Sequence, residues 1–122
     1  MSRQLRAGEG WRLGWQPTTI SAFQGLVGTN EWAVELTQPE FADFHRLLLQ
    51  LVDVFEQMSD QLMDKETITC EASSDLIWMQ ARGYPQQFSL SFILLSGRRA
   101  EGQWDVSSTV ELVNAMQTIE VF

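Results

Sequence analysis

Histidine and paired carboxylates are the side chains of this sequence that could do acid–base or metal chemistry. The sequence contains one histidine, His45, so a histidine metal centre or a Ser-His-Asp triad would depend on that single ring. His45 follows Phe44 at the edge of an apolar stripe with helical spacing, which favours a packed or half-exposed helix residue. Two carboxylates four residues apart in the sequence, such as those of Glu31 and Glu35, are ordinarily solvated surface charges. The sequence therefore predicts no catalytic residue and no metal ligand.

A glycine-rich phosphate loop would indicate a nucleotide cofactor. Gly8, Gly10 and Gly14 are closely spaced, but they precede an expected strand instead of linking a strand to a helix. The sequence contains no P-loop and no dinucleotide fingerprint. We therefore expect no cofactor, and we interpret the chain as a protein that is not an enzyme.

Tryptophan and arginine are the residues that could recognise another molecule. Aromatic rings on a sheet face, with arginines nearby, are how many proteins stack single-stranded nucleic acid. Core packing is the competing interpretation, and we prefer it because buried aromatics commonly dominate the core of a small domain. The five tryptophans all fall on or beside expected strands: Trp11, Trp15, Trp32, Trp78 and Trp104.

The charge balance argues against nucleic acid as well. Sixteen acidic residues against eight basic ones give a net charge of −8 and a pI near 4.4. Such a chain repels phosphate backbones and anionic membranes at long range. All basic residues except Lys65 are arginines, however, and arginine makes bidentate or stacked contacts in specific interfaces. Local arginine patches could therefore still bind a partner.

These observations favour a non-enzymatic binding or protein-interaction module, acting alone or as a homodimer. A sheet face or the Trp/Arg-rich strand ends would meet an unknown protein partner. A single-stranded nucleic-acid-binding or transcription-regulator-like protein is the first alternative. A small-ligand pocket between the sheet and a long helix is the second. The expected interaction residues are Arg12, Trp15, Arg82, Tyr84, Arg98, Arg99 and Trp104.

A long helix is the strongest structural signal in the sequence. Thr37 and Glu40 have the spacing of a capping box, and Leu36 and Phe41 flank them as a hydrophobic staple. Large apolar residues then recur at spacings of three and four as far as Leu62, with polar residues on the opposite side. The pattern predicts a helix that persists to about residue 63 and covers a sheet.

Alternating apolar and polar residues predict strands on both sides of this helix. Strands are expected at residues 11–16, 22–27, 32–36, 67–72, 76–82, 88–95 and 98–104, and Ser107 or Ser108 is expected to cap a second helix. Residues 1–9 show no periodic pattern of apolar and polar residues, and we interpret them as a loose N-terminal arm. The expected fold is α+β: an antiparallel sheet of about six to seven strands on one long helix, with a second C-terminal helix.

The composition is that of one ordinary folded domain over residues 1–122. Hydrophobic residues make up 44% and charged residues 20% of the chain, close to globular averages. No apolar run reaches the roughly 18 residues that a membrane span needs, and the N-terminus lacks the apolar stretch of a signal peptide. The single Cys70 cannot form an internal disulfide. We therefore expect a cytoplasmic protein that does not enter a membrane.

Short motifs of tryptophan, glycine and arginine run through nearly the whole chain. They include residues 10–14 (GWRLG), 26–28 (LVG), 31–37 (EWAVELT), 82–85 (RGYP), 88–90 (FSL) and 101–104 (EGQW). In these motifs the chain resembles a small cyanobacterial domain family of unknown function. The resemblance implies a sheet-and-helix fold similar to the Whirly-type single-stranded-DNA-binding transcriptional regulators, with a cystatin-like fold as the alternative. Nucleic-acid binding would be implied only by that analogy of fold.

Overall fold

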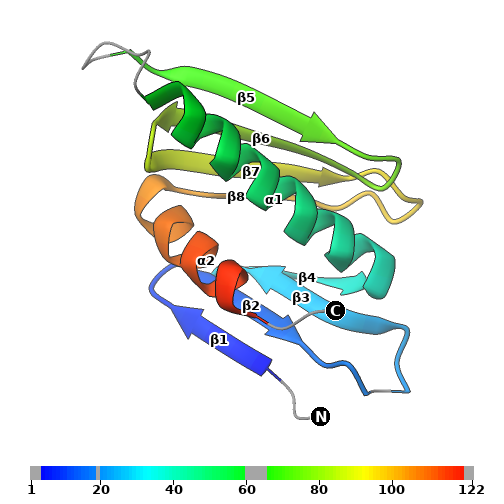
Figure 1. Ribbon diagram of the computed structural model, residues 1–122. Coiled ribbons are helices and arrows are strands. Elements are labelled where there is room, and N and C mark those ends of the chain that lie inside the picture. Colours follow the sequence, from blue (N-terminus) through cyan, green and yellow to red (C-terminus); the bar gives the residue numbers. More distant parts are fainter. Residues whose placement is uncertain (1–3, 19, 60–65, 120–122) are drawn as a thin grey trace.

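The computed structural model describes residues 4–18, 20–59 and 66–119, and its elements follow the predicted order of strands, helix, strands, helix. The helices are α1 (Gln38–Met58) and α2 (Val106–Thr118). The strands are β1 (Gln4–Gly8), β2 (Trp11–Trp15), β3 (Phe23–Gly28), β4 (Ala33–Thr37), β5 (Ile68–Ser73), β6 (Ile77–Tyr84), β7 (Gln87–Leu94) and β8 (Glu101–Trp104). Figure 1 shows α1 crossing between the two groups of strands.

The strands form two antiparallel sheets of four strands each, in the orders β1-β2-β3-β4 and β5-β6-β7-β8. The expected single sheet of six to seven strands is therefore wrong. Where β8 approaches the β3–β4 hairpin, the Trp32 ring lies against Gly102 and its centroid is 5.2 Å from that of Trp104. Side chains occupy this junction, so the two sheets meet through aromatic packing.

The loose arm expected over residues 1–9 is corrected at residues 4–8, and residues 1–3 lie outside the described residues. Gln4–Gly8 forms the edge strand β1, which pairs along its whole length with β2. The pairing gives these residues a ladder of backbone hydrogen bonds that their irregular side-chain pattern did not indicate. Arg6 also donates to the hydroxyl of Thr118, which ties β1 to the end of α2.

The start of α1 confirms the predicted capping box. The hydroxyl of Thr37 accepts from the N–H of Glu40, and the Glu40 carboxylate accepts from the N–H of Thr37 at 2.8 Å. The helix ends at Met58, and the expected continuation over residues 60–63 lies outside the described residues. The predicted apolar stripe is buried at Phe41, Phe44, Leu47, Leu48, Leu51 and Phe55.

The second helix begins with a different cap from the one expected. Asp105, not Ser107 or Ser108, has the extended backbone of an N-cap, and its carboxylate accepts from the N–H of Ser108 at 2.8 Å. The preceding strand is shorter than predicted, because residues 95–100 form the connection after β7, which includes a turn closed by the N–H of Arg99 on the carbonyl of Ser96. The polar edge strand therefore begins at Glu101.

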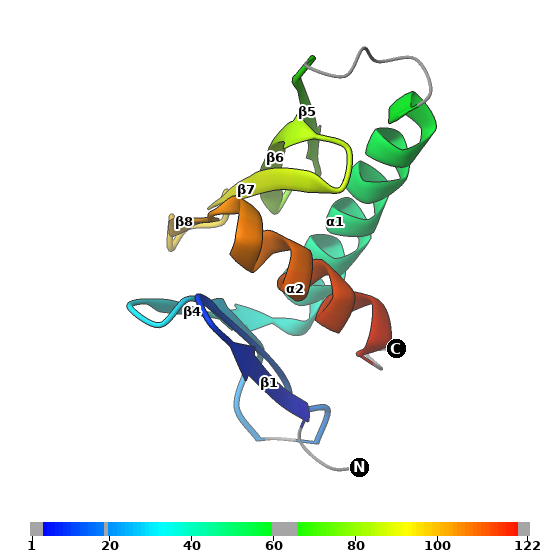
Figure 2. The same ribbon diagram turned by 90° about the vertical axis from the view of Figure 1, so that its left-hand side faces the viewer.

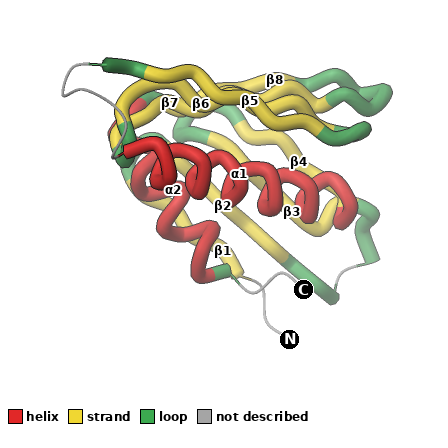
Figure 3. The backbone as a smooth tube through the Cα atoms, turned by 45° about the horizontal axis from the view of Figure 1, so that its top comes forward, coloured by secondary structure: helices red, strands yellow, loops and turns green. Residues whose placement is uncertain are grey.

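The core fills the angle between the two sheets. The sheets open away from their junction, and both helices lie between them (Figures 2 and 3). α1 contacts β3 and β4 of the first sheet and β5 and β6 of the second, while α2 contacts β1, β2 and β7. One hydrophobic cluster results, and it includes three of the five tryptophans, Trp11, Trp15 and Trp104.

Candidate functional site

A polar hollow lies where the second sheet meets the tip of the β3–β4 hairpin and the start of α2. We call it the sheet-junction cleft, and its volume is about 600 Å³. Its lining comes from segments far apart in the sequence, which only the fold brings together. The lining residues are Gly10, Thr29, Asn30, Glu31, Trp32, Gln80, Arg82, Ser89, Leu90, Ser91, Gln103, Trp104, Asp105 and Ser108.

Strand register builds the floor of the cleft from the outer face of the second sheet. Gln80 on β6 pairs with Ser91 on β7, which pairs with Gln103 on β8, so the three side chains form a row across the sheet. Arg82 and Ser89 form the next row. Successive residues of a strand point to opposite faces, so these polar residues alternate with buried ones such as Met79, Ala81 and Leu90.

The same outer face continues into a second, smaller hollow. It has a volume of about 300 Å³ and shares Ser91 and Gln103 with the sheet-junction cleft. The half-buried Trp78 forms part of its wall, with its indole N–H donating to Glu71 at 3.3 Å. The two hollows adjoin at Ser91 and Gln103, and we call them together the recess of the second sheet, from Arg82 to Trp78.

Hydrogen bonds from Arg12 and Trp104 hold the opposite wall, the hairpin tip, in place. The Arg12 guanidinium donates to the carbonyls of Thr29 at 2.6 Å and Trp32 at 3.0 Å. The Trp104 indole N–H donates to the carbonyl of Gly28 at 2.8 Å. Backbone carbonyls on both sides of the tip are therefore bonded to side chains of the first and second sheets.

Three charged side chains line the cleft, and one of them has a structural task. The N–H of Ser108 bonds to the Asp105 carboxylate, and this holds the pKa of Asp105 below its ordinary value. That carboxylate serves as the cap of α2. Glu31 stands on the hairpin tip, and the exposed Arg82 guanidinium makes no hydrogen bond or ion pair with any described residue. Arg82 is therefore the cation that the cleft offers to a ligand.

Comparison with known proteins identifies the family. A family model described as a domain of unknown function, DUF1818, matches residues 6–119. The chain belongs to this family. The matched residues include the junction between the sheets and every element that lines the cleft. None of the curated proteins matches the chain.

A solved structure supports the same fold for this DUF1818 domain. It is described as the crystal structure of a protein with unknown function from the DUF155 family, from Prochlorococcus sp. NATL2A. The two proteins are 29% identical, with a TM-score of 0.86, over 97% of this chain and 98% of the other. The expected resemblance to a small cyanobacterial family of unknown function is confirmed, and the comparisons name no activity.

Of the predicted interaction residues, only Arg82 and Trp104 line the sheet-junction cleft. Trp104 is 2% exposed, so its contribution is the hydrogen bond that braces the hairpin. Arg12 braces the same hairpin from outside the lining. Trp15 is buried and stacks on Phe41 at 5.1 Å between ring centroids, whereas Tyr84 is 40% exposed at the end of β6.

Arg98 and Arg99 lie away from the cleft, in the turn between β7 and β8. Arg98 donates to the Glu40 carboxylate and to the carbonyl of Glu35 at 2.7 Å, and its guanidinium lies 4.6 Å from the centre of the Phe23 ring. It therefore joins the second sheet to the start of α1. The exposed Arg99 has a positive φ of 51° in the same turn, and its side chain makes no hydrogen bond or ion pair with any described residue.

The floor residues Gln80, Ser91 and Gln103 were not among the predicted site residues. Alternation of polar and apolar residues places each on the outer face of its own strand, and this signal was present in the sequence. It does not reveal that the three lie in one row, because that depends on the register of two hairpins. The register is a property of the folded sheet.

The described residues offer no metal centre. They contain no group of three or more His, Cys, Asp or Glu side chains that could hold a metal ion. His45 is half-buried on α1 and is linked by a hydrogen bond to the backbone of Met116 on α2. Neither described helix is long and apolar enough to cross a membrane.

Proposed function

We propose that this domain is a non-enzymatic binding module that holds an extended segment of a partner protein across the outer face of its second sheet. The segment would enter at Arg82, cross the row of Gln80, Ser91 and Gln103, and reach Trp78. The observation that carries the proposal is that the sheet-junction cleft and the hollow beside it adjoin on one face of the second sheet.

The chemistry of the floor supports a polypeptide. A glutamine side chain carries one acceptor and two donors, and so matches the N–H and C=O groups of a peptide. Gln80 and Gln103 lie two strands apart in one row, with the Ser91 hydroxyl between them. An extended chain that crosses this row would meet side chains that both donate and accept hydrogen bonds. The floor therefore fits peptide groups better than it fits a small apolar molecule.

Arg82, the cation of the cleft, supports the proposal that the partner segment contains an acidic residue. Arginine binds carboxylates through two parallel hydrogen bonds, and Arg82 has its guanidinium available. At the far end, the half-buried Trp78 offers an apolar ring beside Ile93 for a side chain of the partner. We infer a partner segment with an aspartate or glutamate near Arg82 and an apolar residue near Trp78.

Single-stranded nucleic acid is the alternative, and the order of four strands, helix, four strands, helix supports the proposal that the fold is Whirly-like. The distribution of charge and aromatic residues favours the polypeptide. The net charge is −8, and the cleft has a single arginine. Trp11, Trp15 and Trp104 are buried, so they provide no stacking surface for bases.

Selection from a random peptide display library tests the proposal. We expect enriched peptides to contain Asp or Glu, and Arg82→Gln to weaken their binding about tenfold because the charge-assisted hydrogen bonds are lost. Gln103→Ala should weaken the same peptides. Arg99→Gln is the matched control, because it removes an equal charge from the turn outside the cleft, and it should bind as the wild type does.

Two outcomes would overturn the proposal. One is that no peptide is enriched, and the other is that enriched peptides bind Arg82→Gln as tightly as the wild type. Fluorescence anisotropy with a labelled single-stranded oligonucleotide at low salt examines the alternative in parallel. Oligonucleotide binding that Arg82→Gln abolishes, without peptide enrichment, would assign the recess to nucleic acid instead.

A further inference from the structure

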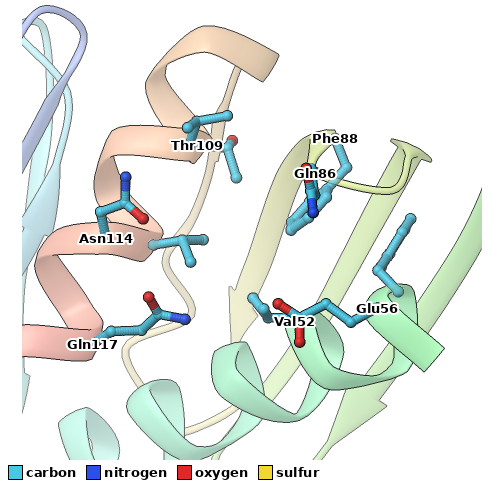
Figure 4. A pocket seen from close by; sticks show the side chains of 10 residues that line it. Val52, Glu56, Gln86, Phe88, Thr109, Asn114 and Gln117 are labelled. Atoms are coloured by element: carbon cyan, nitrogen blue, oxygen red, sulfur yellow. The ribbon is translucent and has the colours of Figure 1, made fainter. Parts of the chain in front are cut away.

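A third hollow lies between the two helices, on the opposite face of the second sheet from the sheet-junction cleft. We call it the interhelical groove. Its volume is about 340 Å³, within the range of small-molecule sites. Figure 4 shows side chains of α1, of α2 and of the β6–β7 turn facing one another across it. The lining residues are Val52, Phe55, Glu56, Gln86, Phe88, Thr109, Val110, Val113, Asn114 and Gln117.

The floor and walls of the interhelical groove are apolar. The rings of Phe55 and Phe88 stack with their centroids 4.6 Å apart and are 1% and 6% exposed, so they form a packed floor. Val52 is half-buried on α1, and Val110 is 40% exposed on α2. An apolar molecule seated here would cover valine surface that is now in contact with water.

Polar groups surround this apolar floor at the rim. Asn114 and Gln117 are exposed on α2, and the Gln86 side chain faces them from the β6–β7 turn (Figure 4). All three are neutral amides that both donate and accept hydrogen bonds. Glu56 is the one charged residue in the lining, and it would repel an anionic head group. The rim therefore selects a neutral or cationic polar group.

The backbone of Gln86 is the observation that points to use of this groove. Tyr84 pairs with Gln87, so Pro85 and Gln86 form a two-residue hairpin loop. Gln86 has a positive φ of 66°, a conformation that glycine adopts readily and glutamine does not. With proline before it, the loop has the form of a type II turn, whose third position favours glycine.

The side chain of Gln86 does not compensate for this strain within the fold. It is exposed, and its amide makes no hydrogen bond with any described residue. It does line the interhelical groove, opposite Asn114 and Gln117. Strained backbone conformations cluster at ligand and active sites, and here the strained residue points its side chain at a hollow.

We propose that the interhelical groove binds a small molecule with an apolar body and an amide or amine head group. The apolar body lies on Phe55, Phe88 and the valines of the two helices. The head group bonds to the amides of Gln86, Asn114 and Gln117, and Glu56 excludes a carboxylate in its place. This site is separate from the proposed polypeptide recess and does not depend on it.

Three probes with one apolar body test the head-group preference: 3-phenylpropanamide, 3-phenylpropylamine and 3-phenylpropanoate. Titration followed by amide NMR should shift the side-chain NH₂ signals of Gln86, Asn114 and Gln117 with the first two probes. The carboxylate probe should bind several-fold more weakly in the wild type. Shifts spread evenly over the surface, or equal affinity for all three probes, would overturn the proposal.

Glycine substitution at the strained position separates ligand binding from folding. Gln86→Gly should raise the Tm, on the order of 3 °C, because it relieves the left-handed strain. It should weaken the amide probe about five- to tenfold, because one head-group partner is lost. Arg99→Gly is the matched control, since Arg99 also has a positive φ but lies outside the groove.

Comparison of Gln86→Gly with Arg99→Gly shows whether Gln86 acts in the groove or only in the turn. Arg99→Gly should also raise the Tm and should leave probe affinity unchanged. If Gln86→Gly gains stability and binds the amide probe as tightly as the wild type, Gln86 has no role in the groove and the assignment fails. If Gln86→Gly loses stability, the side chain supports the turn itself, and the argument from strain is wrong.

Discussion

The carboxylate of Glu40 is shared between the cap of α1 and the guanidinium of Arg98, 58 residues further along the chain. One oxygen accepts from the N–H of Thr37 at 2.8 Å and from Arg98, and the other accepts from the Ser96 hydroxyl at 2.9 Å. Glu40 is 4% exposed, so its charge is stabilised almost entirely by these donors. This one side chain therefore holds together the first sheet, α1 and the β7–β8 turn.

Removal of Arg98 should destabilise the domain. Arg98→Ala leaves the buried Glu40 carboxylate without its cation, and we expect a loss of about 1–3 kcal/mol in the free energy of unfolding. Chemical denaturation measures the difference. Arg99→Ala is the control, because its side chain has no partner among the described residues, and it should change stability by less than about 0.5 kcal/mol. Equal effects of the two variants would contradict the assignment.

The same carboxylate should make stability depend on pH in the acid range. Burial alone would raise the pKa of Glu40, but the hydrogen bonds from Thr37 and Ser96 and the charge of Arg98 outweigh it and lower the pKa below 4.5. A lowered pKa in the folded state stabilises the fold above pH 4.5, and this contribution is lost as the pH falls through the folded-state pKa. Glu40→Gln should lack that contribution.

Denaturation of both proteins over a pH series checks this sign. The difference in free energy of unfolding between wild type and Glu40→Gln should be largest near neutral pH and should shrink below pH 4.5. Other carboxylates titrate in the same range, but they are common to both proteins and cancel in the difference. A difference that grows as the pH falls would contradict a lowered pKa.

His45 should give a second pH dependence, at higher pH. Burial lowers the pKa of its ring below 6.5, against a weaker raising effect of the hydrogen bond with Met116. The unfolded chain binds the proton first as the pH falls, so stability decreases from pH 6.5 down to the folded-state pKa and is level below it. Proton NMR reports that pKa without ambiguity, because the chain has one histidine. A measured value above 6.5 would refute the prediction.

The parts of the fold that the sequence predicted are those held by local contacts. The cap of α1 depends on Thr37 and Glu40, which are three residues apart, and its apolar stripe repeats within the same segment. The hairpins depend on neighbouring strands joined by short turns. The second helix was found, but its cap was assigned to the serines after Asp105, since each of these residue types can cap a helix.

The division into two sheets could not be predicted in the same way. It depends on contacts such as the hydrogen bond from Trp104 to the carbonyl of Gly28, 76 residues away in sequence. The prediction of the interaction residues failed at two positions for a similar reason. Arg12 and Arg98 looked available for a partner, yet both bond to backbone carbonyls within the chain. Every residue has a backbone carbonyl, so the sequence does not show which carbonyl an arginine will bond to.

Gly102 should be indispensable to the junction between the sheets. A Cβ atom at this position would overlap the ring of Trp32, which is packed between Gly102 and the Trp104 ring. Gly102→Ala must therefore displace a large, half-buried ring from its contacts at the junction, and we expect a cost of about 1–3 kcal/mol in the free energy of unfolding. The displaced ring would also disturb the wall of the sheet-junction cleft, because Trp32 lines it.

Gly97 provides the matched control for this prediction. It lies in the turn between β7 and β8, and a Cβ atom there would meet nothing within 4 Å. Gly97→Ala should be neutral or stabilising by up to about 1 kcal/mol, because it restricts the unfolded chain without a steric cost in the fold. Urea denaturation of the two variants decides the matter. If Gly102→Ala unfolds at the same midpoint as Gly97→Ala, then Trp32 does not need the space that glycine leaves, and close packing of Trp32 on Gly102 is not what joins the two sheets.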